Sequence, residues 1–307
     1  MEITKYFEQD SLEEAMKQLS NDFSRIEQEL PYDLSYGDLY HIVDAFYSIG
    51  LRGENVLEFG GNLNKEFIQT HIKPSCWHSI TLDLYESDYR HNENQLIRDQ
   101  INIEAANTDY AYTNLGLQFL SIAQHIFGDN KPYSRIFSVA AFEHLRQPLN
   151  CMQKLYKLCK ENTLIYSFFT PVWSAPNGHH WSNCPVTLPP YIHLAMRPWE
   201  LKQYLISEGN LSEVEAEKHS HFIYSSTRIN RLTPVEWKQV FSSMPFNIVE
   251  CLPISPLCID NLNVDIMTKK KIFNSIQSRD ICSGYRLIAK KQSLTNRAKA
   301  KQENHKI

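Results

Sequence analysis

Short apolar runs that alternate with helical segments from residue 55 onward constrain this 307-residue chain more than any other feature. The runs are rich in β-branched and aromatic residues, which favour strands, and the segments between them have helical spacing. This alternation predicts a parallel sheet with crossover helices. The predicted strands are NVLEFG (55 to 60), SITLDLY (79 to 85), NQLIRD (94 to 99), YSRIFSVA (133 to 140) and NTLIYSFF (162 to 169).

Other segments flank this alternating region. Ser11 and Glu14 have capping-box spacing and open a predicted helix over 11 to 30, and a second helical pattern covers 39 to 46. After the fifth strand, helical segments around 197 to 208 and 233 to 243 predict inserted layers. The remaining predicted elements are a crossover helix at 148 to 160, strands at 246 to 254 and 284 to 291, and a polar stretch at 260 to 280 that separates those two strands.

Composition excludes several classes of protein. The formal net charge of -4 gives no overall attraction to nucleic acid, and only the tail after Lys290 is basic. No apolar run approaches the ~20 residues of a membrane span, and the start MEITKYFEQD has no secretory pattern. The seven cysteines include no C-x-x-C pair, which fits thiols in a reducing compartment. We therefore expect a cytoplasmic protein that binds neither membrane nor nucleic acid.

The segment VLEFGGNLN (56 to 64) spans the first strand-to-helix turn, which is the usual ligand site of an open α/β sheet. Gly60 and Gly61 allow a tight turn with close approach of the backbone to a ligand. Glu58 would repel a pyrophosphate but suits a cationic ligand, and Asp83 lies at the end of the second predicted strand, where an acid can bind a ribose diol. These features point away from NAD and toward S-adenosylmethionine.

A family resemblance becomes specific at this point. VLEFGGNLN, the acid in ITLDLY, YSRIFSVAAFEHL and NTLIYSFFTP resemble class I S-adenosylmethionine-dependent methyltransferases of the small-molecule or O-methyltransferase-like type. The resemblance covers about residues 50 to 175, and the last two predicted strands are similar to the antiparallel hairpin that ends the family's sheet. It implies an α/β fold with a seven-stranded, mostly parallel sheet and flanking helices, the Rossmann-like methyltransferase fold.

The helical patterns, the resemblance and the charge distribution together predict a domain organisation. Residues 1 to 50 form a helical N-terminal extension, 51 to 291 a methyltransferase-like domain, and 292 to 307 a flexible basic tail. An insertion at about 171 to 245 carries a substrate loop and helices.

The resemblance also implies cofactor contacts. Residues of the first turn lie against the methionine part of S-adenosylmethionine, Asp83 holds the ribose, and Asp99 reaches the adenine amine. The segment after the fourth predicted strand contacts the methionyl end. The implied cofactor-binding residues are Glu58, Gly60, Gly61, Asn62, Asp83, Asp99, Ser138, Val139 and Ala140.

The chain departs from the family pattern at several positions. Asn62 and Asn64 stand in place of later motif glycines, Ser134 replaces an acid before the fourth strand, and Glu161 begins ENT in place of a glycine pair. Asp83 and Asp99 each have a simpler interpretation as well, in which the side chain caps a loop or faces water.

Three histidines are candidates for a catalytic base. Glu143 and His144 match an E-H pair that lies beside the transferred methyl in the family, and a neutral imidazole at His144 can accept a proton near neutral pH. His144 can equally tie down a loop. PVWSAPNGHHW (171 to 181) places His179 and His180 at the same edge, either in a substrate loop or in a proline-fixed loop whose tryptophans fill the core.

No metal site is expected, because the spacing of His179, His180, Cys184 and His193 matches neither H-E-x-x-H nor paired C-x-x-C. LPPY (188 to 191) is similar to a motif of adenine-methylating enzymes, but that motif begins with Asp or Asn and directly follows the fourth strand, whereas LPPY begins with Leu and lies after the fifth. It therefore predicts a turn, in line with the absence of a nucleic-acid charge pattern. The sequence therefore predicts methyl transfer from S-adenosylmethionine to a small-molecule or glycan acceptor, at a hydroxyl oxygen, with the acceptor's identity and the oligomeric state left open. The alternatives are a binding module of the same fold without turnover, and an NAD-dependent oxidoreductase.

Overall fold

The computed structural model describes most of the chain. The described residues are 3–30, 34–61, 63–80, 110–113, 133–145, 147–181, 186–226 and 229–291. Several sequence predictions lie outside them: Asn62, Asp83 and Asp99 of the cofactor site, Cys184 of the metal set that was weighed, the strand at 94 to 99 and the basic tail at 292–307.

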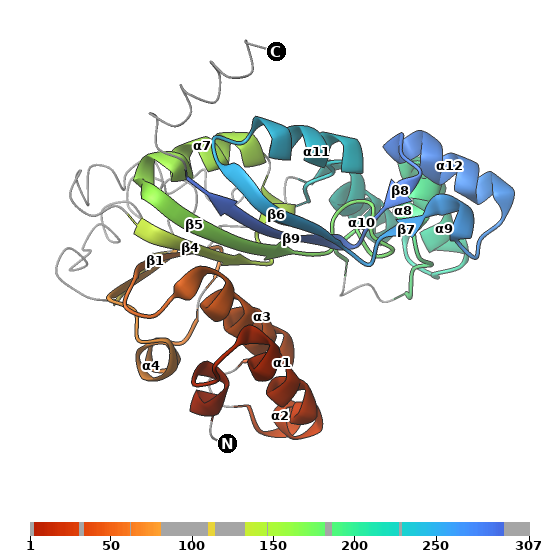
Figure 1. The fold of residues 1–307 in the computed structure, drawn as a ribbon. Coiled ribbons are helices and arrows are strands. Elements are labelled where there is room, and N and C mark those ends of the chain that lie inside the picture. The colour runs from red at the N-terminus through yellow and green to blue at the C-terminus, as the bar shows by residue number, and fades with distance from the viewer. Residues whose placement is uncertain are drawn as a thin grey trace, which may run out of the picture.

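A mixed sheet forms the centre of the molecule (Figure 1), with the strand order β3-β2-β1-β4-β5-β9-β6. Pairing is parallel from β3 through β5, whereas β9 runs antiparallel to both β5 and β6. The first five strands follow the doubly wound order, which confirms the predicted mostly parallel α/β sheet. The strands are β1 (Asn55–Phe59), β2 (Cys76–Ile80), β3 (Tyr110–Thr113), β4 (Tyr133–Val139), β5 (Cys159–Phe169), β6 (Asn247–Ile254) and β9 (Gly284–Lys290).

Two strand positions differ from the sequence prediction. The second strand begins at Cys76, three residues before the predicted start, because Cys76, Trp77 and His78 pair with β1. The strand that pairs with β2 on its other side is β3 at 110 to 113, whereas the sequence predicted 94 to 99, a segment outside the described residues.

Helices of the first fifty residues cover one face of the sheet (Figure 1). The predicted helix at 11 to 30 is broken at Asp22, whose φ of -92° and ψ of 2° end one helix and precede the next. A capping box between Ser35 and Asp38 opens the last α-helix of these fifty residues, which begins at Tyr36. The elements are η1 (Ile3–Phe7), α1 (Leu12–Asn21), α2 (Phe23–Glu29), α3 (Tyr36–Ala45) and η2 (Phe46–Gly50). Leu39 and Val43 share one hydrophobic core with Val56 on β1.

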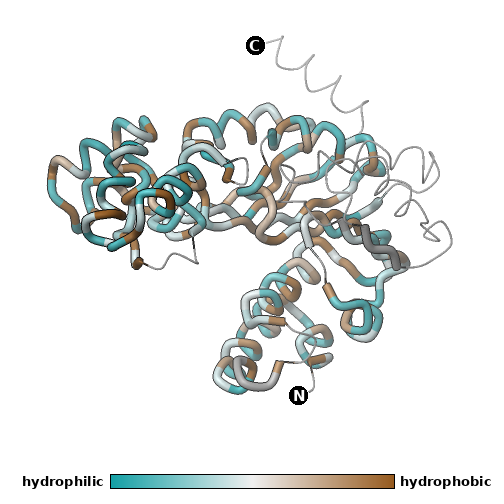
Figure 2. Tube along the Cα trace, turned by 180° about the vertical axis from the view of Figure 1, so that it is seen from behind, coloured by the Kyte–Doolittle hydropathy of each residue, from teal (hydrophilic) through white to brown (hydrophobic). Residues whose placement is uncertain are grey.

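The opposite face is covered by α7 (Pro148–Leu158) and α11 (Pro234–Ser243) (Figure 1). Both were predicted from the sequence. Leu155 and Trp237 bury their side chains against this face of the sheet, in a core that includes Phe169. Figure 2 shows hydrophobic residues concentrated along the strands, while the covering helices carry hydrophilic residues as well.

A third group of elements lies beyond one end of the sheet (Figure 1). It consists of α8 (Ile192–Ala195), α9 (Pro198–Ser207), α10 (Glu213–Ser225), η7 (Ile259–Asn261), α12 (Ile266–Ile276) and the two-stranded sheet of β7 (Leu257–Cys258) and β8 (Asp280–Ile281). The stretch 260 to 280, predicted as a polar separator, contains α12. Its three consecutive lysines obscure the pattern, yet Ile272 and Ile276 are fully buried.

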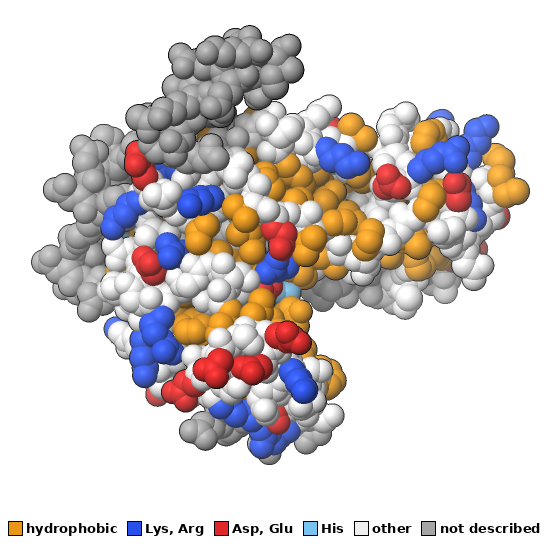
Figure 3. All heavy atoms as spheres, in the orientation of Figure 1, with side chains coloured by type: hydrophobic (Ala, Val, Ile, Leu, Met, Phe, Trp, Pro, Cys, Tyr) orange, Lys and Arg blue, Asp and Glu red, His pale blue; other side chains and the backbone are white. Residues whose placement is uncertain are grey.

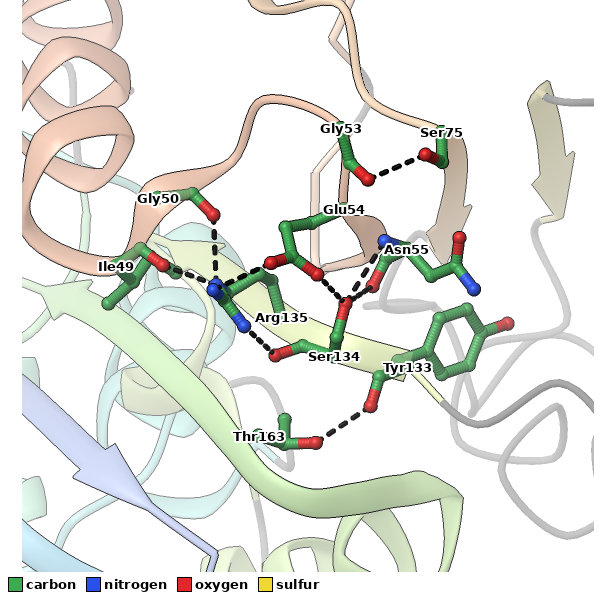
Figure 4. A network of polar contacts seen from close by, with 10 residues as sticks. All are labelled: Ile49, Gly50, Gly53, Glu54, Asn55, Ser75, Tyr133, Ser134, Arg135 and Thr163. Carbon is green, nitrogen blue, oxygen red and sulfur yellow. Dashed lines mark hydrogen bonds and ion pairs between the residues drawn. The ribbon is translucent and has the colours of Figure 1, made fainter.

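A polar network ties the N-terminal helices to the edge of the sheet where β1 and β4 begin (Figure 4). The guanidinium of Arg135 donates to the carbonyl oxygens of Ile49 and Gly50 and forms an ion pair with Glu54, with an Nη2–Oε1 distance of 2.8 Å. Ser134 donates to the same carboxylate at 2.6 Å. The end of η2 is thereby fixed at the amino edge of the sheet.

Within the part of the chain that the structure describes, no helix combines the length and the apolar character needed to cross a membrane.

Candidate functional site

The predicted turn lies at the switch point of the sheet, where β1 has β2 on one side and β4 on the other. Helices that follow such neighbouring strands leave on opposite faces, so a crevice opens at the strands' carboxyl ends. After β1 the chain passes through Gly60 and Gly61 and enters the short helix α4 (Lys65–Phe67). Gly60 has a φ of 87°, a left-handed conformation that side chains disfavour.

Glu58 supports this turn from beneath. Its side chain is 1% exposed and accepts hydrogen bonds from the indole of Trp77 at 2.9 Å, from the backbone N–H of Leu63 at 3.1 Å and from the hydroxyl of Ser79. Burial raises the pKa of Glu58, while these three donors favour the ionised form. The carboxylate is thus engaged by the protein's own groups rather than turned outward.

Gly61 is required by the position of that carboxylate. A Cβ atom at residue 61 would lie 2.0 Å from Oε1 of Glu58 and 2.6 Å from its Cδ. Because three hydrogen bonds fix Glu58, the clash has no inexpensive relief. The two residues form one packed unit that sets the path of the turn.

Asn64, at a position where the motif of the resembled family has a glycine, has a structural role. Its side-chain oxygen accepts hydrogen bonds from the backbone N–H groups of Glu66 at 2.8 Å and Phe67 at 3.1 Å, so Asn64 is the N-cap of α4. The substitution therefore starts the helix after the turn and does not by itself indicate a degraded motif.

The second part of the predicted cofactor site is the end of β4. Ser138 is fully buried, Val139 is partly buried, and Ala140 is exposed in a left-handed conformation with a φ of 51°. The N–H of Ala140 donates to the carbonyl oxygen of Phe168 at 2.8 Å. Residues 138 to 140 thus lie at the carboxyl end of β4, which is the neighbour of β1 in the sheet.

Several buried polar atoms without a partner among the described residues are on β4 and β5 or in the segments that follow these strands. Ser138 on β4 and Ser167 on β5 are opposite each other in the parallel register, and neither hydroxyl oxygen has a hydrogen-bond partner. Oε2 of Glu143 and Nε2 of His180, in the loops after the two strands, are unpartnered as well. Because buried polar atoms are nearly always paired in folded proteins, the facing hydroxyls of Ser138 and Ser167 mark a place for a polar ligand or water.

Glu143 is held in place by a residue that the sequence did not indicate. The N–H of Asn230 donates to the carbonyl oxygen of Glu143 at 2.9 Å, and its side chain donates to that of Leu145 at 2.7 Å. Burial raises the pKa of Glu143 to about 8, against the opposing effect of its own N–H and that of Thr170. Glu143 is therefore protonated at neutral pH. Asn230 carries no local signal for this role, because the two segments are far apart in the chain.

The structure brings two of the three candidate histidines together. The rings of half-buried His144 and His180 lie edge to face with centroids 4.8 Å apart. Burial and the proximity of His144 lower the pKa of His180 to about 4. His179 is directed elsewhere: its Nδ1 accepts the N–H of Trp181 at 3.0 Å, and its ring lies 5.4 Å from that of His193.

The loop over 171 to 181 is largely part of the core. Trp173 is 6% exposed and packs with Tyr191 and Ile192 in the hydrophobic core of the third group of elements. Gly178 lies so close to the carbonyl oxygen of Val172 that a Cβ would approach it to 2.5 Å. The sequence allowed either a substrate loop or a proline-fixed loop whose tryptophans fill the core. The buried position of Trp173 agrees with the second interpretation, while His180 remains at the edge of the predicted site.

Among the residues that the structure describes, no group of three or more His, Cys, Asp or Glu side chains is arranged to hold an ion.

A groove of about 560 Å³ lies away from the predicted site, between α11 and the β6–β9 hairpin. Phe241, Cys251, Pro253, Leu257 and Tyr285 are among its lining residues, and none of the predicted site residues lines it. Figure 3 shows hydrophobic side chains gathered over this part of the surface.

No family model and no curated protein matches the sequence. Structural neighbours include an S-adenosylmethionine-dependent methyltransferase from Mesorhizobium loti, with 10% identity and a TM-score of 0.40 over 82% of this chain and 96% of that one. The plantazolicin methyltransferase BpumL, solved with a desmethyl-plantazolicin analogue and S-adenosylhomocysteine, has 12% identity and a TM-score of 0.38 over 95% of both chains.

The [4+2]-cyclase SpnF is similar to a comparable degree, with 8% identity and a TM-score of 0.41 over 86% of each chain. At these values the neighbours establish no activity for this chain. The assignment of its fold therefore rests on the strand order described above.

Proposed function

We propose that the protein is an S-adenosylmethionine-dependent methyltransferase that acts on a small-molecule or glycan acceptor, at a hydroxyl oxygen. The observation that supports this most is the turn after β1, which Glu58 and Gly61 brace at the switch point of the sheet. This position is where open α/β sheets bind nucleotide-like ligands.

The residues present fit such a cofactor. Gly60 and the segment 138 to 140 provide backbone at the crevice, and the unpartnered hydroxyls of Ser138 and Ser167 offer polar groups nearby. S-adenosylmethionine, when bound, supplies a methyl group on a positively charged sulfur. Glu58 contributes in this proposal by holding the turn, while the contacts of Asn62, Asp83 and Asp99 rest on the sequence alone.

The chemistry requires mainly that the acceptor be positioned in line with the methyl group. A base helps where the nucleophile is a neutral hydroxyl, because its proton must leave. We assign His144 as the first candidate for that base and His180 as the second, since their rings meet at the edge of the site. His179 remains the weakest of the three candidates, because the backbone of Trp181 occupies its Nδ1.

Methyl transfer is tested by product mass. The protein is incubated with S-adenosylmethionine carrying an isotopically labelled methyl group and with a panel of hydroxylated small molecules, oligosaccharides, amines and thiols. A product heavier by one labelled methyl group, absent from reactions without protein, is the expected result. Label recovered only on amine or thiol acceptors would contradict the assignment to a hydroxyl oxygen.

A further inference from the structure

The N-terminal helices reach the predicted reaction edge because α3 and η2 run opposite to β4 and β5. Gly50, at the end of η2, is bonded to Arg135 near the start of β4. The hydroxyl of Tyr166 donates to Asp44 at 2.8 Å. One turn earlier in the helix, the ring of His41 stacks on Phe168 with centroids 3.6 Å apart. The first turn of α3 therefore lies at the carboxyl edge of the sheet.

A row of aromatic side chains continues outward from that contact. It consists of Phe168, His41, Tyr40, Tyr36 and Phe23, and successive ring centroids are 3.6, 5.3, 6.3 and 4.6 Å apart. These rings are not sealed in a core: Tyr40 and Phe23 are 39% and 40% exposed, and the other three are partly exposed. We call this set the aromatic row. It offers flat apolar surface that remains accessible.

The aromatic row begins one strand away from the predicted cofactor segment. Phe168 is opposite Val139 in the parallel register of β4 and β5. Its carbonyl oxygen accepts the N–H of Ala140 at 2.8 Å. A molecule lying on the row is therefore next to residues 138 to 140.

The hydrogen bonds around His41 determine which of its ring nitrogens can accept a hydrogen bond from a ligand. The hydroxyl proton of Tyr166 is donated to Asp44, so its oxygen accepts from Nδ1–H of His41 at 3.3 Å. Nε2 then carries a lone pair and has no partner among the described residues. Burial lowers the pKa of His41 to about 4, against the raising effect of Asp44, so the ring is neutral at physiological pH.

We infer that the acceptor in the proposed methyl transfer carries a flat aromatic or heteroaromatic ring with a ring hydroxyl or N–H group. The ring packs against the aromatic row, and the polar group donates a hydrogen bond to Nε2 of His41. The role of this molecule as the methyl acceptor rests on the proposed function, whereas the preference for a ring rests on the aromatic row itself. Offset and edge-to-face ring contacts favour aromatic over saturated partners of equal size.

Two matched probes test this preference in the unmodified protein. Calorimetric titration with 2-naphthol and with its saturated counterpart decahydro-2-naphthol compares molecules of the same carbon skeleton and hydroxyl position. We expect saturable binding of 2-naphthol that is roughly three- to tenfold tighter than binding of the saturated compound. Equal affinities, or no saturable binding of 2-naphthol, would overturn the inference.

Variants then locate the site. Tyr40→Leu should weaken 2-naphthol binding, while Trp199→Leu, which changes a 61% exposed ring on α9, should leave it unchanged. His41→Phe keeps the stacked ring but removes Nε2, so it should weaken 2-naphthol and leave 2-methoxynaphthalene unaffected. Equal losses in Tyr40→Leu and Trp199→Leu would place the probe elsewhere and contradict the inference.

A parallel titration with S-adenosylhomocysteine separates this inference from the proposed function. Ring selectivity without S-adenosylhomocysteine binding would refute the methyltransferase proposal and keep the aromatic site. Binding of S-adenosylhomocysteine without any preference for 2-naphthol would refute the ring preference and leave the methyltransferase proposal standing.

Discussion

At the scale of single residues, the site is defined by polar groups whose positions only the fold reveals. Glu58 was predicted from its place beside two glycines, yet its orientation beneath the turn depends on Trp77 and Ser79 of the next strand. Gly61 follows from the same contact, because its missing side chain leaves room for the carboxylate. The sequence identified the residue types, and the neighbouring strand determines what they do.

Glu143 leads to a prediction about pH. Its carboxyl group keeps a proton in the folded protein up to about pH 8, whereas an exposed Glu in the unfolded chain loses it near pH ~4.3. The folded state therefore binds more protons across this window, so the free energy of unfolding should fall as pH rises from about 4 through 8. The expected contribution is on the order of a few kcal/mol.

Glu143→Gln, which resembles the protonated acid, should remove that part of the pH dependence. Denaturant unfolding of both proteins at pH 5 and at pH 8 provides the measurement. The contradictory outcome is an unchanged slope in the variant, which would mean that Glu143 titrates alike in the folded and unfolded states.

At the scale of elements, the strands and crossover helices were predictable, but the way in which α3 meets the sheet was not. β1, β4, β5 and α7 follow from local patterns of β-branched and apolar residues. By contrast, the contact between His41 and Tyr166 joins positions 125 residues apart. No periodic pattern carries such information, because it depends on how the helix lies across the strands.

The ion pair that fixes α3 to β9 leads to a second prediction. Nε and Nη2 of Arg286 bind the two oxygens of Asp44 at 2.6 and 2.7 Å, and Asp44 is 4% exposed. Burial alone would raise the pKa of Asp44, but hydrogen bonds from Arg286, Ser48 and Tyr166 hold it below its ordinary value. Removing the cation leaves a buried charge without its main partner.

Arg286→Gln should therefore lower the free energy of unfolding by about 3 to 5 kcal/mol. Arg279→Gln is the matched control, because Arg279 forms an exposed ion pair with Asp260 at 3.0 Å and such pairs contribute about 0 to 1 kcal/mol. Urea titration of the two variants gives the comparison. Similar losses in both would show that the buried pair contributes no more than the exposed one.

At the scale of the whole molecule, the sheet brings the segments of the proposed site together at its carboxyl edge. The turn after β1, the end of β4 and the first turn of α3 come from three separate parts of the chain. In Figure 3 the surface is hollowed between the N-terminal helices and the group of elements beyond the sheet. The sequence motifs predicted that the turn after β1 and the end of β4 belong to the site. The N-terminal helices were predicted only as an extension.

The central claim is that the braced turn after β1 holds an S-adenosyl ligand, and calorimetric titration with S-adenosylhomocysteine tests it most directly. We predict saturable binding to the unmodified protein and none to Gly61→Ala, in which a Cβ 2.0 Å from the Glu58 carboxylate must displace it. Gly37→Ala, whose nearest contact would be 3.6 Å away, should bind normally. Absence of binding to the unmodified protein, or saturable NADH binding in its place, would contradict the account.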